Sequence, residues 1–130
     1  MQQPNNEIWI RDKIKLVLEG NILYITVIGG IDAEVANETK IQHRKITENV
    51  KGQLNMMVDM NKSGKDSPEA SNVWKDLCEE KDSYIAAYGL NPVSKVLASF
   101  FIAMTGNKRI RFFSTKEQGL EWLKEITEKQ

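Results

Sequence analysis

Cysteine and histidine are almost missing from this chain of 130 residues, which has one of each, Cys78 and His43. One cysteine cannot form an internal disulfide, and the pair cannot supply the four ligands of a structural zinc site. We therefore expect no disulfide, no metal and no cofactor. A nucleophilic cysteine needs a positively charged neighbour, so Cys78 is interpreted as a small buried side chain. His43 is interpreted as a hydrogen-bonded residue at the edge of the core.

The chain also lacks an excess of charge of one sign, since 18 basic residues balance 18 acidic ones. Proteins that bind nucleic acids or anionic membranes normally carry a basic excess, so neither class fits. No apolar run approaches the roughly 20 residues of a membrane-spanning helix. The first residues, "MQQPNNEIWI", lack the basic and apolar regions of a signal peptide. The expected location is the cytoplasm.

The hydrophobic content of 41% is sufficient for one core, and the length is too small for two ordinary domains. We expect a single domain over residues 1–130. Alternating or continuous apolar residues predict strands over residues 7–19, interrupted near 11–13, and over 22–28, 54–60, 84–88 and 109–113. Apolar residues at helical spacing predict helices over 33–51, 68–80, 92–104 and 114–125. Asp32 is the predicted N-cap of the first helix, and Ser114 or Thr115 that of the last.

This order of elements predicts an α/β fold. An N-terminal β-hairpin is followed by strands that alternate with about four helices, which favours a mostly parallel sheet with an antiparallel strand near one edge. In such sheets, ligands and partners meet the carboxyl ends of the strands.

The stretch "VDMNKSGKDSPEA", residues 58–70, follows one of these strand ends. Its polar residues are predicted to form a binding surface made of Asp59, Asn61, Ser63, Asp66 and Ser67. Ser67 directly precedes Pro68, and this pair is typical of an N-cap followed by the first residue of a helix. We favour capping over phosphorylation as the role of Ser67.

The predicted helix over residues 92–104 is apolar on nearly all sides. Phe101 and Ile102 point away from the face that can pack on the sheet, and Phe100 and Met104 lie beside them. A large uncovered apolar patch is rare on a soluble monomer. We expect these four residues to form a homodimer contact or the mouth of an apolar ligand site.

Several of these motifs are similar to a known family. The segments "YIAAYGLNP" and "RIRFFSTKEQGLEWL", and the strand end "VDMN", resemble the SpoIIAA-like branch of the STAS family. This branch is related to bacterial anti-sigma-factor antagonists and has a fold like that of CRAL-TRIO proteins. The resemblance implies a βα sandwich, no catalysis, and the binding of a protein or an apolar ligand.

Signalling members of this family carry a D-S-S-G-like motif that exposes a serine to a kinase. Asp66 and Ser67 match its first two positions, but Pro68 occupies the place of the serine that is usually phosphorylated, and Glu69 replaces the glycine. Ser63, followed by Gly64, is a second, weaker match. Ser67 and Ser63 are therefore the candidate phosphorylation sites.

The sequence favours a non-enzymatic, cytoplasmic, regulatory module that binds a protein or a second copy of itself. The alternative is a carrier or sensor of an apolar small molecule or lipid, which rests on the apolar excess of residues 93–104. A third hypothesis, a small enzyme that uses Asp59 and Ser67, has less support because one carboxylate is not an acid/base pair.

Overall fold

One mixed β-sheet forms the centre of the protein. The computed structural model describes residues 7–64, 67–70, 72–73, 84–89 and 109–128. Six strands in these residues follow one another across the sheet in chain order, from β1 to β6. They are β1 (Glu7–Ile10), β2 (Ile14–Glu19), β3 (Ile22–Gly29), β4 (Asn55–Ser63), β5 (Ile85–Tyr88) and β6 (Ile110–Phe113). The first three strands pair antiparallel, and β3 to β6 pair in parallel.

Two tight turns shape the antiparallel part of the sheet. Arg11 and Asp12 have positive φ angles of 48° and 58°, and Lys13 N donates to Ile10 O over 2.9 Å. This turn separates β1 from β2 where the apolar alternation is interrupted. Gly20, with φ of 62°, turns the chain from β2 into β3. The predicted hairpin is confirmed, and the interruption of residues 7–19, for which a bulge and a turn were both open, is a turn.

Helix α1 (Ala33–Thr47) begins at the predicted cap, where Val35 N donates to Asp32 Oδ1 over 2.9 Å. It is shorter than the predicted range of 33–51, because it ends at Thr47. Gly52 has a φ of 84°, but it lies in the link to β4 and is not the residue that ends the helix. The predicted end was therefore wrong by about one turn.

Helix α4 (Lys116–Glu128) begins with a reciprocal pair of side-chain contacts. Gln118 N donates to Thr115 Oγ1 over 3.3 Å, and Gln118 Oε1 accepts hydrogen bonds from the backbone N–H groups of Ser114 and Thr115. This is the capping box that a Thr and a Gln three residues apart predict. The sequence had indicated a cap at Ser114 or Thr115, and the contacts assign it to Thr115.

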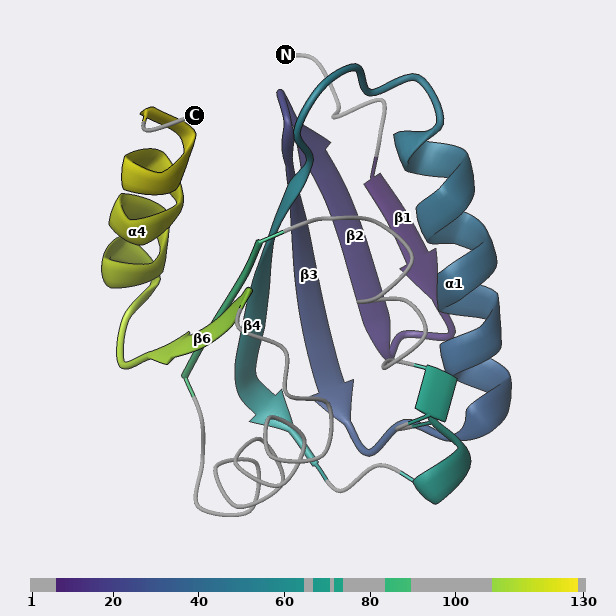
Figure 1. Ribbon diagram of the computed structural model, residues 1–130. Coiled ribbons are helices and arrows are strands. Elements are labelled where there is room, and N and C mark those ends of the chain that lie inside the picture. Colours follow the sequence, from purple (N-terminus) through teal and green to yellow (C-terminus); the bar gives the residue numbers. More distant parts are fainter. Residues whose placement is uncertain (1–6, 65–66, 71, 74–83, 90–108, 129–130) are drawn as a thin grey trace, which may run out of the picture.

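The two helices cover opposite faces of the sheet, α1 over β1 and β2, and α4 over β4 to β6 (Figure 1). On the α1 face, Val35 and Ala36 pack with buried strand residues such as Ile10, Leu16 and Leu23. Ala70 is fully buried in the same cluster, so the segment at 67–73 lies on this face too. On the α4 face, Leu123 packs on Met57 and Ala86. Gly119 allows this close packing, since a Cβ there would lie 3.2 Å from the Cβ of Ala86.

The number of helices differs from the prediction of about four. The described residues contain three helical segments, which are α1, α4 and a short one at residues 68–70 and 72–73. The expected count included a helix over residues 92–104, and that range lies outside the described residues. Cys78 also lies outside them.

Candidate functional site

The candidate site lies at the carboxyl end of β5 and over the second half of the neighbouring parallel strand β4. Asp59 of β4 pairs with Tyr88 of β5 and with Thr26 of β3, so these three side chains share one face. Asp59 Oδ1 accepts hydrogen bonds of 2.9 Å from both the backbone N and the side-chain Nδ2 of Asn61. The Tyr88 hydroxyl is also hydrogen-bonded to the Asp59 carboxylate. Hydrogen bonds thus hold the side chains of Asp59, Asn61 and Tyr88 in one arrangement.

Two tyrosines of this face keep their protons to unusually high pH. Burial and the nearby Asp59 carboxylate raise the pKa of Tyr88 to about 12. Burial, followed by the charge of Glu19, also raises the pKa of Tyr24. The neutral phenol is favoured because a phenolate would lose hydration and would be repelled by the carboxylates. Both hydroxyls therefore remain protonated, and able to donate a hydrogen bond, above the pH at which an unperturbed tyrosine ionises.

Gly89 makes room for the amide of Asn61. Its φ is 75°, and a Cβ at this position would lie 2.4 Å from the Asn61 side chain. The backbone beyond β5 therefore turns in a conformation that favours glycine and lies directly against the site. Any larger residue at position 89 would displace Asn61 from Asp59.

A β-bulge separates Ser63 from Asp59. Between its pairs with Thr26 and Ile28, β4 has one residue more than β3, so that Ser63 lies opposite Gly29. An extra residue shifts the alternation of side chains by one position. Ser63 is only 7% exposed, and its Oγ donates to Met60 O over 2.8 Å. It therefore does not share a face with Asp59, although a regular alternation over four residues would place both side chains on the same face.

Ser67 makes the expected capping contact. Its Oγ accepts a 3.1 Å hydrogen bond from Ala70 N, and its own backbone N donates to Ile31 O over 3.0 Å. The first contact begins the short helical segment that carries the buried Ala70. The second ties this segment to the link between β3 and α1. Ser67 is half-buried, whereas Pro68 and Glu69 are exposed.

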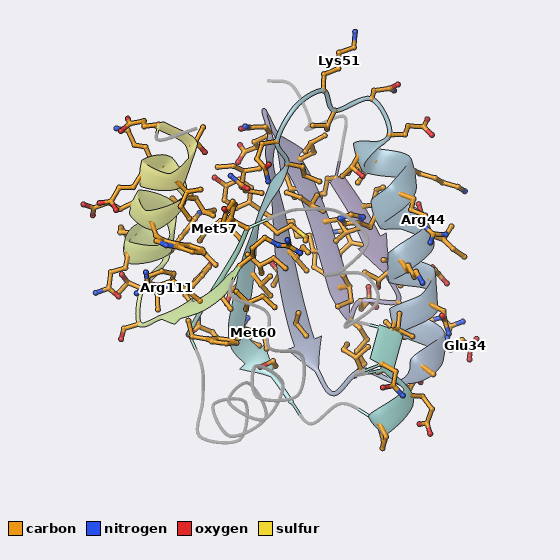
Figure 2. The ribbon with its side chains drawn as sticks, viewed as in Figure 1. Glu34, Arg44, Lys51, Met57, Met60 and Arg111 are labelled. Atoms are coloured by element: carbon orange, nitrogen blue, oxygen red, sulfur yellow. The ribbon has the colours of Figure 1, made fainter. Side chains whose placement is uncertain are left out.

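An aromatic cluster adjoins the site along α4. The ring of Trp122 lies 5.9 Å from that of Tyr84 and 5.6 Å from that of Phe113, between centroids. The guanidinium of Arg111 is 5.7 Å from the Phe113 ring and 5.5 Å from the Trp122 ring. Figure 2 shows Arg111 beside α4, on the side of the sheet toward which Met57 extends. The contacts of Arg111 with aromatic rings explain why a basic residue precedes Phe112 and Phe113. A role in binding nucleic acid is not needed to explain it.

The structure brings together only part of the predicted binding surface. Asp59 and Asn61 are in contact, Ser63 is turned away and buried, and Ser67 is used as a cap in the next segment. Asp66 lies outside the described residues, as do Phe100, Phe101, Ile102 and Met104. The predicted polar loop is also shorter than expected, because Asn61, Lys62 and Ser63 belong to β4.

Tyr88 is the residue of the site that the sequence analysis missed. A signal for it was present, because Asp59 and Tyr88 lie near the ends of the consecutive predicted strands 54–60 and 84–88, and the carboxyl ends of neighbouring parallel strands lie on the same side of a sheet. Among the described residues, no group of three His, Cys, Asp or Glu side chains is placed to hold a metal ion. Within the same residues, no helix is long and apolar enough to cross a membrane.

Comparison with known protein families shows the family of this chain. It belongs to the family described as domain of unknown function DUF7793, whose model matches residues 16–127. No curated protein matches the chain.

Solved structures of low sequence identity share its fold. An uncharacterized protein of the DUF3478 family from Shewanella loihica, described as having a SpoIIAA-like fold, is 16% identical with a TM-score of 0.62. The match covers 85% of this chain and 91% of that one. A sulfate transporter family protein from Wolinella succinogenes is 15% identical with a TM-score of 0.62, covering 86% and 92% of the two chains.

The anti-sigma factor antagonist SpoIIAA, in its unphosphorylated form, is 8% identical with a TM-score of 0.57, covering 85% and 97%. The chain therefore has the SpoIIAA-like fold, as the resemblance implied.

Proposed function

We propose that this chain is a non-enzymatic regulatory module that binds another protein through the surface at the carboxyl end of β5 and the second half of β4. The observation that carries the proposal is the fixed polar surface formed by Asp59, Asn61 and Tyr88. Its hydrogen bonds hold the side chains in place before any partner arrives, which reduces the entropy lost on binding. The fold supports this reading, since one structure that shares it is named an anti-sigma factor antagonist.

Regulation by phosphorylation is not part of this proposal. SpoIIAA, which shares the fold, is described in its unphosphorylated form. In the present chain, however, the Ser63 hydroxyl is buried and bonded to Met60 O. The Ser67 hydroxyl is occupied as a helix cap. Neither serine is presented as a free hydroxyl beside Asp59.

The test compares two substitutions of the same chemical type on opposite sides of the molecule. Asn61→Arg places a long cation at the proposed surface, whereas Asn37→Arg places one at an exposed position of α1. A partner is first identified by cross-linking in cells and then purified. Asn61→Arg should weaken its binding at least about tenfold, and Asn37→Arg should leave it unchanged. Equal affinities for the two variants, both with native thermal stability, would contradict the proposed surface.

The alternative function, a carrier or sensor of an apolar small molecule or lipid, depends on residues 93–104, which are outside the described residues. Native mass spectrometry of the gently purified chain distinguishes the two functions. A carrier keeps a lipid-sized mass, whereas the proposed module has the mass of the protein alone or of a protein complex.

A further inference from the structure

The outer edge of β1 carries backbone groups that no strand of the described sheet uses. β1 is the first strand of the sheet that the described residues form, and within that sheet it pairs only with β2. Lys13 N donates to Ile10 O, so the carbonyl of Ile10 points toward β2. In an antiparallel ladder, this direction alternates from residue to residue. The N–H and C=O groups of Ile8 therefore face β2, and those of Glu7 and Trp9 face outward.

The side chain of Trp9 is unusually exposed for its type. It is 48% exposed, and Trp9 and Ile41 are the two exposed large hydrophobic residues in the described part of the chain. The Lys15 ammonium lies 5.8 Å from the Trp9 ring centroid and 3.7 Å from the Glu7 carboxylate. Edge strands usually carry features that prevent such groups from pairing with another chain. β1 has two of these features, since it is short and carries the charged Glu7, but its outward hydrogen-bonding groups lie beside an exposed apolar ring and no described strand covers them.

We propose that β1 pairs antiparallel with β1 of a second copy of this chain, about a two-fold axis that passes between the two Ile8 residues. In this register Glu7 of each copy lies opposite Trp9 of the other. Glu7 and Trp9, whose backbone groups face outward, then each donate one hydrogen bond to the other copy and accept one from it. Four N–H···O bonds form across the axis in this way. A register centred on Trp9 forms fewer such bonds, because Arg11 has already left the strand with a φ of 48°.

Side-chain chemistry agrees with this register and favours a second copy as the partner. On one face the half-buried Ile8 meets its own equivalent and extends the apolar layer below α1. On the other face each Glu7 lies beside the Trp9 of the other copy, over which a Lys15 ammonium is held. Each Glu7 therefore lies near the Lys15 of the other copy, so that opposite charges, and not like charges, face each other across the axis. The contact is separate from the Asp59 surface, so either proposal can fail without the other.

Two substitutions of Glu7 isolate the backbone contribution. Glu7→Pro and Glu7→Ala both remove the carboxylate, but only proline removes the outward N–H, and proline is tolerated at the first residue of an edge strand. Four-residue strands bury little surface, so association is measured by sedimentation up to about 1 mM protein. We expect a concentration-dependent dimer for the wild type and for Glu7→Ala. Glu7→Pro should weaken the dimer about tenfold or more, since two of four hydrogen bonds are lost.

A cross-link tests the register directly. Opposed residues of a non-hydrogen-bonded antiparallel pair have Cα atoms about 4.5 Å apart, within the range that a disulfide spans. In a Cys78→Ser background, Ile8→Cys should therefore form a disulfide dimer at least about tenfold faster than the exposed control Ile41→Cys. The proposal is overturned by a monomer at every concentration, by equal association of the two Glu7 variants, or by equal cross-linking rates. Circular dichroism verifies that each variant is folded.

Discussion

Substitution of Ser67 tests how much the capping contact contributes to the stability of the folded protein. Ser67→Ala removes one hydroxyl, which accepts a single hydrogen bond of 3.1 Å from Ala70 N. It leaves no cavity of consequence, and the backbone contact to Ile31 O remains. The loss is therefore that of one N-cap, about 0.5 to 2 kcal/mol. With an unfolding entropy of about 2.1 cal/mol/K per residue, the 130-residue chain should melt about 2 to 7 °C lower.

Ser67→Asp is the matched comparison. A carboxylate can accept the same hydrogen bond from Ala70 N and interacts favourably with the positive end of the helical segment, so the melting temperature should be retained. Differential scanning calorimetry measures both variants. The reasoning is refuted if Ser67→Ala melts within about 1 °C of the wild type. It is also refuted if phosphate is found on Ser67 in cells and Ser67→Asp abolishes binding that Ser67→Ala retains.

Three further predictions follow from close contacts and from one shifted pKa. Gly64→Ala should destabilise the protein by about 1 to 3 kcal/mol in chemical denaturation, since its Cβ would lie 2.8 Å from the backbone N of Gly30. Gly119→Val should cost about as much, because α4 must move away from Ala86. Gly119→Ala should cost less, because the higher helix propensity of alanine offsets part of the cost of a Cβ placed 3.2 Å from that of Ala86. The pKa of Tyr88, about 12, lies above the usual value of about 10, so the folded state keeps a proton that the unfolded state loses. The free energy of unfolding should therefore fall as pH rises between these values, and Tyr88→Phe should remove this part of the pH dependence.

The sequence analysis succeeded where local chemistry decides the structure. Asp32, Thr115 and Ser67 are short polar residues before helical segments, and each one makes the capping contact that its position predicts. The interruption of the apolar alternation after Ile10 is a turn. These features depend on residues within four positions of one another, so the sequence contains the needed information.

Errors occurred where pairing between distant segments decides the structure. Asn61 to Ser63 were interpreted as a loop because they are polar, but β3 continues beside them through Ile28 and Gly29 and keeps them in a strand. The bulge that buries Ser63 depends on the register between β3 and β4, which no local pattern records. The contact between Tyr88 and Asp59 was missed for the same reason, because it requires the register between β4 and β5.

The order of strands in the sheet has a consequence for how the chain acquires its structure. Among the described strands, each one from β2 to β6 is added next to the strand that precedes it in the chain, and none of them is inserted between two others. During synthesis the sheet can therefore grow from the N-terminal hairpin outward, one strand at a time, without undoing a pairing already made. At every intermediate length the last strand formed is the growing edge, and it stays open until its successor leaves the ribosome.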